Sequence, residues 1–292
     1  MDRATRLPDH LVEDALAFEN GDRTPVEPKH ASTVVLMRDG SDGPGSLEVY
    51  LLRRHVDMAF AAGMCVFPGG GVDPRDFDQD IGWAGPTGAE WAALTGVDEP
   101  LARALVCAAV RETFEESGVL LAGPSPVDVV ADTTAEDWEA DRVALESRAV
   151  SFTDFLSRRG LVLRTDLLRL WGSWVTPVFE PRRYDTQFFL AQLPEGQVTR
   201  DVSTESDRVL WSPVRDAIRM VDAGDMLMLP PTYCTCAELF GYADTGSALD
   251  AAGDRDLTPV RPAAVRDGDG VYLSIPEPLV ALGRDVAEKV RG

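Results

Sequence analysis

The chain has 292 residues, of which 45% are hydrophobic, and it carries 49 acidic against 28 basic side chains. The formal net charge of −21 repels nucleic-acid backbones and anionic membranes, so we expect neither as a partner. Locally basic pockets could still bind small phosphate esters. No apolar stretch approaches the length of a membrane span, and residues 1–6 lack the apolar core of a secretion signal, which predicts a cytoplasmic protein.

Residues 1–30 are predicted to form an N-terminal extension. Leu11 to Glu19 has the pattern of a short amphipathic helix, and a connector rich in glycine, proline and charge follows it. No catalytic motif falls here, and the segment suits a cap or part of a homodimer interface. We therefore predict one catalytic domain over residues 31–245, with residues 246–292 as a C-terminal extension packed on it.

Strand patterns follow at residues 32–37, 47–53 and 64–67, and the turn-rich residues 39–46 make the first two a hairpin. The third strand leads into the run Phe67-Pro68-Gly69-Gly70-Gly71. Because glycine has no Cβ, the backbone here can come close to a metal ion or a phosphate group. The run is therefore a candidate ligand-binding loop.

The segment that follows, residues 72–99, contains seven acidic side chains and one arginine, a net charge of −6. This composition favours a solvated flap over a second site. A helix is then predicted from Pro100 to Ser117, with Asp98 as its N-cap and Gly118 as its C-terminal signal.

Three carboxylates lie near the end of this helix. Glu112, Glu115 and Glu116 have the spacings i, i+3 and i+4, which bring their side chains together. Two such charges about 5.5 Å apart repel by roughly 3 kcal/mol near a protein surface, and the C-terminal end of a helix also disfavours anions. One interpretation is a solvated helix face. The other is a cleft in which a divalent cation offsets the repulsion, and the glycine run upstream favours this second interpretation.

The glycine run and the segment that begins at Arg111 together resemble the signature of the Nudix hydrolases, G-x5-E-x7-R-E-U-x-E-E-x-G-U, where U is aliphatic. The second half matches except for Thr113 at the first U position. The first half is displaced, because Gly70 and Arg111 are 41 positions apart where the family has 14, so 27 residues are inserted. Counting back from Arg111 without a gap finds Val97 and Arg103 in place of glycine and glutamate, and the first glutamate is thus not identified.

One Nudix subgroup carries an interrupted box of this kind, and the chain resembles it, the peroxisomal coenzyme A diphosphatase type, over roughly residues 30–240. The shared segments are Trp174-Val175-Thr176-Pro177, Pro181 to Leu190, Leu210-Trp211-Ser212-Pro213 and Leu229-Pro230-Pro231. The resemblance implies an α/β fold, the Nudix α/β/α sandwich with a mixed sheet and extra inserted helices on one edge. It also implies hydrolysis of a diphosphate bond in a nucleoside diphosphate derivative.

Further elements are predicted downstream of the box. Strands are expected at residues 119–121, 171–178, 184–193, 208–211 and 271–273, and helices at 135–147, 152–158, 213–222, 231–244 and 279–290. The helices at 135–158 lie in an insertion at residues 125–165. The four cysteines have apolar or helical contexts and no zinc or redox spacing, so we expect reduced thiols that pack in the core.

The family resemblance implies Mg2+ or Mn2+ as the cofactor. Glu112, Glu115 and Glu116 would supply oxygen ligands together with a backbone carbonyl near Gly70, and such hard ligands suit these ions. Arg111 is one turn from Glu115 and could hold that carboxylate in place, although this order is the weaker one for a helical pair.

Two roles are open to alternatives at this point. The reaction requires a general base, and Glu205 is a candidate because it lies just before a predicted strand. Asp201 and Asp207 are competing candidates. An exposed acidic loop would explain all three carboxylates without a catalytic role. Arg182 and Arg183 are either surface charges or a phosphate clamp, because guanidinium groups bind phosphate in a bidentate manner.

The substrate is the least determined part. Arg54, Gly63 and the run from Phe67 through Gly69 and Gly70 match the spacing of the family's coenzyme A signature, whereas Leu52, His55 and Ala59 depart from it. Coenzyme A or its acyl esters are the first candidates. The alternatives are an ADP-ribose or nucleotide-sugar diphosphatase and, in a different class, a non-catalytic nucleotide sensor, which the unidentified first glutamate would suit.

Overall fold

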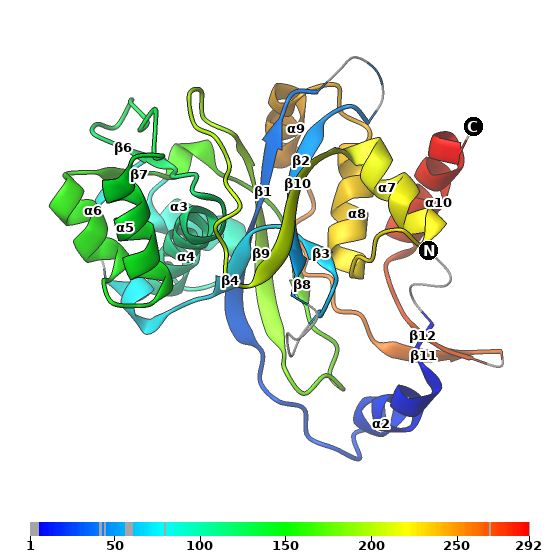
Figure 1. The fold of residues 1–292 in the computed structure, drawn as a ribbon. Helices are drawn as coiled ribbons and strands as arrows, with labels where there is room; N and C mark the ends of the chain where they lie inside the picture. The colour runs from blue at the N-terminus through cyan, green and yellow to red at the C-terminus, as the bar shows by residue number, and fades with distance from the viewer. Residues whose placement is uncertain are drawn as a thin grey trace.

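The protein is built around a mixed sheet covered by helices on both faces (Figure 1). The computed structural model describes residues 6–40, 43, 45–55, 61–78, 80–268 and 270–291. The main path of the sheet has the order β10-β2-β1-β9-β8, with β3 paired to β2 and β4 paired to β1. Its strands are β1 (Lys29–Arg38), β2 (Glu48–Arg54), β3 (Cys65–Val66), β4 (Gly69–Gly71), β8 (Arg169–Val175), β9 (Tyr184–Gln192) and β10 (Ser206–Pro213).

One face of the sheet is covered by α3 (Gly88–Thr95) and α4 (Glu99–Ser117), and α5 (Glu136–Glu146) and α6 (Phe152–Arg159) lie outside α4. The layer on the other face contains α7 (Val214–Ala223), α8 (Pro230–Leu239), α9 (Thr245–Ala251) and α10 (Glu277–Arg291). The α/β/α sandwich predicted from the family resemblance is therefore confirmed. Short 3-10 turns η1 (Pro74–Phe77), η2 (Thr165–Leu167) and η3 (Ala252–Asp254) connect the elements.

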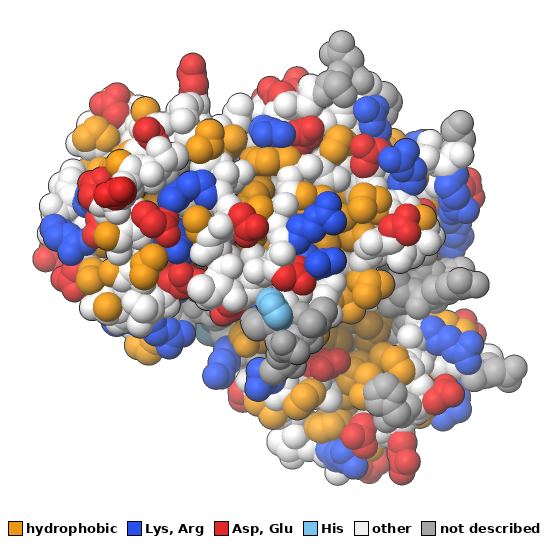
Figure 2. Space-filling view, in the orientation of Figure 1, with side chains coloured by type: hydrophobic (Ala, Val, Ile, Leu, Met, Phe, Trp, Pro, Cys, Tyr) orange, Lys and Arg blue, Asp and Glu red, His pale blue; other side chains and the backbone are white. Residues whose placement is uncertain are grey.

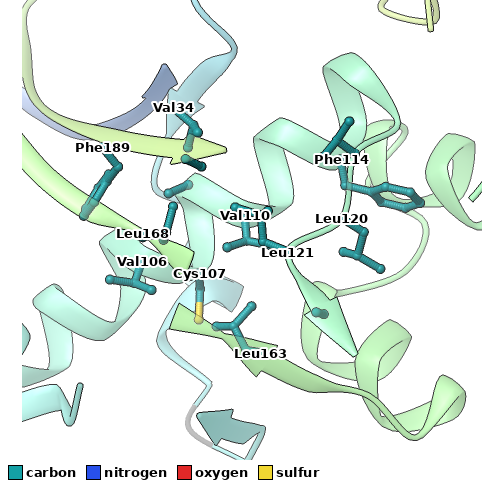
Figure 3. Close-up of a cluster of buried hydrophobic side chains, with 14 of the residues drawn as sticks. Val34, Val106, Cys107, Val110, Phe114, Leu120, Leu121, Leu163, Leu168 and Phe189 are labelled. Carbon is teal, nitrogen blue, oxygen red and sulfur yellow. The ribbon is translucent and has the colours of Figure 1, made fainter. Parts of the chain in front are cut away.

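The centre of β1 shows why the sheet needs two covering layers. Val34, Val35, Leu36 and Met37 are all fully buried, because side chains alternate between the two faces of a strand and both faces are covered. Val34 and Leu36 belong to the core under α4, and Val35 and Met37 to the core under α7 and α8. Figure 3 shows Val34 among the buried side chains of the first core.

Helix α4 forms where the sequence predicts it. The Asp98 carboxylate accepts a hydrogen bond from the Leu101 N–H at 2.9 Å, and Gly118 ends the helix in the left-handed conformation with φ 75°. The helix packs closely on β1, and the Ser32 hydroxyl donates to the Leu105 carbonyl at 2.6 Å. The last two turns of α4 are therefore held in a fixed position relative to β1.

The prediction of a solvated flap at residues 72–99 is wrong. The segment contains η1, strand β5 (Gly82–Ala84) and helix α3, and β5 pairs with β7 (Val162–Arg164). Trp91 is 1% exposed and lies edge-on to Phe189, with ring centroids 5.7 Å apart. The acidic composition did not indicate this core contact, because most of the carboxylates of the segment are exposed while Trp91 is buried.

Residues 119–121 do not form the predicted strand. They are fully buried, but their backbone is paired by a side chain: the Leu120 N–H donates to Gln197 Oε1 at 2.8 Å and Gln197 Nε2 donates to the Leu120 carbonyl at 2.9 Å. A buried glutamine thus replaces a neighbouring strand. The short strand β6 (Ala122–Gly123) begins just after it and completes a small sheet in the order β5-β7-β6.

The helical insertion lies outside α4 rather than at an edge of the sheet. Figure 1 shows α5 and α6 on the side of α4 that faces away from the sheet. Phe114 of α4 stacks on Phe155 of α6, with ring centroids 5.4 Å apart. The prediction of these two helices is confirmed within two residues at each end. Their expected position is corrected, because Phe152, Phe155 and Leu156 of α6 belong to the same buried cluster as Phe114 of α4.

The two terminal extensions pack against each other. Helix α2 (Asp9–Glu19) and the hairpin of β11 (Ala264–Asp267) and β12 (Gly270–Leu273) share a small apolar cluster that includes Leu7 and Phe179. The Leu7 N–H donates to the Val271 carbonyl at 2.8 Å. The helix predicted at 231–244 is shorter, since α8 ends at Leu239 and α9 is separate.

Further sequence expectations concern the cysteines and the membrane. Cys65, Cys107, Cys234 and Cys236 are free thiols and all are buried, as expected. Within the described part of the chain, no helix combines the length and apolarity needed to cross a bilayer.

Candidate active site

The sheet register and α4 bring the glycine run to the glutamates. Strand β4 pairs with β1 so that Gly70 lies opposite Ser32, and α4 packs over the same strands. A Cβ on Gly70 would lie 2.5 Å from the Glu112 carboxylate, so glycine is required for this approach. The Gly69 N–H donates to Glu116 Oε2 at 2.8 Å. The predicted convergence of loop and helix is therefore present.

Arg111 connects the glycine run, two of the glutamates and the inserted segment through hydrogen bonds. Its Nη1 donates to Glu112 at 2.8 Å and lies 3.3 Å from Glu115, and its Nη2 donates to the Gly71 carbonyl at 3.1 Å. A second pair of hydrogen bonds, both 2.9 Å, joins its Nε and Nη2 to the carboxylate of Asp76. Arg111 thus holds Glu115, as proposed from the sequence, and also ties the glutamates to the insertion.

Asp76 is the acidic residue that the sequence analysis missed. It lies six positions after Gly70, which is the place of the first glutamate in the G-x5-E half of the family signature. Its side chain is 1% exposed and paired with Arg111. Counting forward from Gly70, instead of back from Arg111, would have found it. The first acid of the signature, which the sequence alone left unidentified, thus has an aspartate in its place, and the inserted residues follow Asp76.

Burial gives the three glutamates unusual acidities. Exclusion from water, and secondarily the charge of Glu112, raise the pKa of Glu115 to about 7, against the opposing effect of Arg111. Burial and the charge of Glu112 also raise the pKa of Glu116 well above its ordinary value, while the Gly69 N–H opposes this. The pKa of Glu112 is raised by burial and lowered by Arg111, with burial the larger effect. A further cation would favour the ionised form of all three.

The donor set fits a hard divalent ion, because carboxylate and carbonyl oxygens are the ligands that Mg2+ and Mn2+ prefer. The cradle between Gly70 and Glu112, which a Cβ would fill, supports the same fit. The described residues do not, however, form a ready-made cage of three acidic, histidine or cysteine side chains. Arg111 lies between Glu112 and Glu115, and Glu116 is turned to the Gly69 N–H. Ion binding would therefore require these carboxylates to rotate.

A cavity of about 720 Å³ adjoins the glycine run. Its floor is one face of the sheet, where the register aligns Gly71, Ala31, Thr186 and Trp174 across four strands. Three inter-strand steps make this row about 14 Å long. Glu112 lines the cavity, whereas Glu115 and Glu116 are 8% exposed and are not part of its lining. The cavity can therefore hold a long ligand with one end at Glu112.

Most predicted binding residues line this cavity. Arg54, Phe67, Gly69, Gly70, Arg182 and Glu205 all contribute to its wall. Arg54 Nη2 lies 3.2 Å from Glu205 Oε2, so these two candidates form an ion pair at the rim. The competitor Asp207 instead pairs with Arg53 at 2.6 Å and is not among the lining residues. Ala59 of the coenzyme A signature lies outside the described residues.

Arg183 does not fit the phosphate-clamp hypothesis. Its Nη1 donates to the Val26 carbonyl at 2.7 Å and its Nε to the Thr176 carbonyl at 3.1 Å. The guanidinium thus fastens the N-terminal connector to β9, and Arg183 is absent from the cavity lining. Of the adjacent arginines only Arg182 faces the cavity, because neighbouring side chains point in different directions.

A glycine run on a mixed sheet that faces a helix bearing glutamates is typical of the Nudix hydrolases. The model of the NUDT19 Nudix domain matches residues 92–239. The chain therefore belongs to the NUDT19 family of Nudix hydrolases and is a diphosphohydrolase.

Known relatives support this assignment. The chain is 27% identical over 284 residues to the acyl-coenzyme A diphosphatase NUDT19 of Gallus gallus, covering 80% of this chain and 72% of that protein. The protein of the same name from Xenopus laevis is 23% identical over 265 residues, covering 78% and 70%. A crystal structure of a Nudix hydrolase from Alicyclobacillus acidocaldarius superposes with a TM-score of 0.64 at 29% identity, covering 77% of this chain and 96% of that one.

Proposed function

We propose that the protein hydrolyses the diphosphate bond of coenzyme A or its acyl esters with the help of Mg2+ or Mn2+. The observation that carries the proposal is the contact of Glu112 and Glu116 with the glycine run next to a long cavity, with Arg111 holding Glu115 beside Glu112. The relatives named acyl-coenzyme A diphosphatase support this substrate class.

Each side chain has a proposed part in the reaction. The ion would be held by Glu112, Glu115 and Glu116 together with the Gly70 carbonyl. When bound, it would neutralise the charge of the diphosphate and activate water. Arg111 orients Glu112 and Glu115. Glu205, at the cavity rim beside Arg54, is proposed to accept the proton of the attacking water.

The walls of the cavity suit coenzyme A chemically. Lys29 and Arg182 lie on its lining and supply positive charge for phosphate groups. Leu7, Phe179 and Leu273 add an apolar wall to which both terminal extensions contribute. Charged and apolar walls in one long cavity match a ligand that joins phosphates to an extended thiol or thioester arm.

An ADP-ribose or nucleotide-sugar diphosphatase is the second candidate, since the same glutamates would cleave the same bond. Product analysis by mass spectrometry separates the two, because only coenzyme A gives 3′,5′-ADP and phosphopantetheine. The non-catalytic sensor loses its motivation, because Asp76 supplies the acid that was thought to be absent.

Replacing Glu115 by glutamine tests the assigned centre. With Mg2+ or Mn2+ we expect the wild type to hydrolyse at least one coenzyme A compound and Glu115→Gln to lose most of that activity. Glu99→Gln is the matched control, because it removes an exposed carboxylate from the first turn of the same helix. Full activity of Glu115→Gln on every compound that the wild type cleaves would show that the centre is misassigned.

The cytoplasmic location and the homodimer stay predictions from the sequence. Cell fractionation tests the first. Light scattering coupled to size-exclusion chromatography tests the second.

A further inference from the structure

Arg148 ends helix α5 in a conformation that usually belongs to glycine. Its φ is 60°, and among the described residues it and Ala61 are the non-glycine residues with positive φ. The Arg148 N–H donates to the Leu145 carbonyl and the Ala149 N–H to the Ala144 carbonyl, both at 2.8 Å. These two bonds make the helix-ending turn whose left-handed position glycine normally takes.

The same chain uses glycine for this purpose elsewhere. Helices α3, α4, α6 and α7 end at Gly96, Gly118, Gly160 and Gly224, all with positive φ. Arginine at the corresponding place in α5 carries a conformational cost that glycine would avoid. Strained backbone conformations of this kind are concentrated at functional sites such as ligand clamps. The left-handed backbone of Arg148 therefore suggests that its side chain has a function.

The turn is anchored next to the glutamate site. Arg75 of η1 donates from Nη1 to the Arg148 carbonyl at 3.0 Å and from Nε to Asp73 Oδ1 at 2.9 Å. The Asp73 N–H donates to Asp76, the residue that follows Arg75, at 2.8 Å, and Asp76 pairs with Arg111 of the glutamate site. A continuous chain of hydrogen bonds therefore fixes the position of the Arg148 backbone relative to the site.

The Arg148 guanidinium itself is weakly held. Its side chain is 78% exposed, and its recorded ion pair is a long one, 3.9 Å to Asp73, a carboxylate that Arg75 already binds through two nitrogens. Yet Arg148 lines the cavity together with Gly71, Val72 and Asp73. Arg54, another cation of the lining, is engaged by Glu205. Arg148 is thus a cation with spare donors on the glycine-run side of the cavity.

We propose that Arg148 is a substrate-binding residue that donates hydrogen bonds to a phosphate group of the substrate diphosphate. The inference rests on the proposed function, because it assumes that a diphosphate lies beside the glycine run. The helical insertion at residues 125–165 then has a role, since it brings a phosphate ligand to the site. Arginine suits this task because its planar donors match phosphate oxygens in pairs.

The test combines stability with binding of methylenediphosphonate, a diphosphate analogue that is not hydrolysed, measured by calorimetry on the full chain with Mg2+. For Arg148→Gly we expect the melting temperature to stay equal or rise by about 1–3 °C as the strain is relieved, while the affinity falls about tenfold or more. Arg148→Lys, which keeps the charge, should retain most of the affinity. Arg284→Ala, which removes an exposed arginine from α10, is the control for overall charge and should bind like the wild type.

The proposal is overturned if Arg148→Gly binds the analogue as tightly as the wild type, or if Arg284→Ala weakens binding equally. A lower melting temperature or failure to fold in Arg148→Gly would also overturn it, because the side chain would then be structural. Binding of the analogue is independent of turnover, so absence of coenzyme A hydrolysis in the wild type would count against the proposed substrate and leave the Arg148 result to be judged separately.

Discussion

Asp76 and Arg111 form a buried ion pair across the inserted segment, with two hydrogen bonds of 2.9 Å and side-chain exposures of 1% and 10%. The pair links the glycine run to the helix that bears the glutamates. Since Arg111 also contacts Glu112 and Glu115, loss of Asp76 would change the balance of charge in the whole site.

Replacement of Asp76 by alanine should therefore destabilise the protein by about 1–3 kcal/mol, because the buried Nε and Nη2 groups of Arg111 lose their hydrogen-bond acceptor while Glu112 and Glu115 still balance the charge of Arg111. Chemical denaturation with urea measures this. Asp78→Ala is the control, because Asp78 is exposed in the same segment and its loss should cost less than about 0.5 kcal/mol. Equal stability of the two variants would contradict the structural role of Asp76.

Gly70→Ala should impair catalysis more than stability. The new Cβ would lie 2.5 Å from the Glu112 carboxylate, and that flexible side chain would move aside. We expect kcat to fall about 10–100-fold, because small displacements of a catalytic group have effects of this size, with little change in melting temperature. In Gly71→Ala the nearest atom to the new Cβ is the His30 carbonyl oxygen at 3.9 Å, so this variant should keep its activity. Similar losses in both variants would refute the explanation.

The stability of the metal-free protein should decrease as the pH rises toward neutrality. Burial raises the folded-state pKa of Glu115 to about 7 from its ordinary value of 4.5, so this group stabilises the fold fully below about pH 4.5 and loses that contribution as the pH rises through about 7. Thermal unfolding in a chelator at pH 5.5 and pH 8 measures the trend. Glu115→Gln should make the trend less steep, while Glu112 and Glu116, whose pKa values burial also raises, keep part of it. Mg2+ should raise the melting temperature more at pH 8 than at pH 5.5 because ion binding needs ionised carboxylates. A trend unchanged in Glu115→Gln would exclude this group as its source.

Glu205→Gln should lower kcat by about 10²–10⁴-fold if Glu205 is the general base, and the pH dependence of the remaining activity should change. Asp207→Asn is the matched control, because Asp207 pairs with Arg53 away from the cavity. Steady-state kinetics over a range of pH values compares the two. A loss of activity in Asp207→Asn instead would move the base to the competing residue.

Leu273→Gln should weaken the preference for acylated substrates. Leu273 lines the cavity from β12, and a polar amide there would oppose burial of an acyl chain, which gains about 0.8 kcal/mol per methylene. We expect KM for a long-chain acyl-coenzyme A to rise about tenfold and KM for free coenzyme A to change little. Val265→Gln, an exposed position 43% accessible on the paired strand β11, is the control. Parallel changes for both substrates would place the acyl chain elsewhere.

The sequence predicted most elements and the central cluster, because helix caps, strand alternation and the i, i+3, i+4 spacing are local signals. It did not predict the role of residues 72–99, since the pairing of Asp76 with Arg111 joins residues 35 positions apart and depends on tertiary folding. Arg148 escaped notice for the same reason, because neither its left-handed backbone nor its place on the cavity has a local pattern. The role of Arg183 stayed open between a surface charge and a phosphate clamp, because the sequence does not tell whether a guanidinium binds a ligand or a backbone carbonyl.

The Asp76–Arg111 contact also explains how the family motif can be lengthened at this point. Thirty-four residues separate the two partners in place of the seven in the uninterrupted signature, and closing the longer loop costs only about 1.4 kcal/mol more by the logarithmic dependence of chain entropy on length. A single buried contact can offset an entropy loss of that size. The connection between the two halves of the motif is thus free to grow and to acquire its own packed structure, whereas the separation of six positions between Gly70 and Asp76 is not.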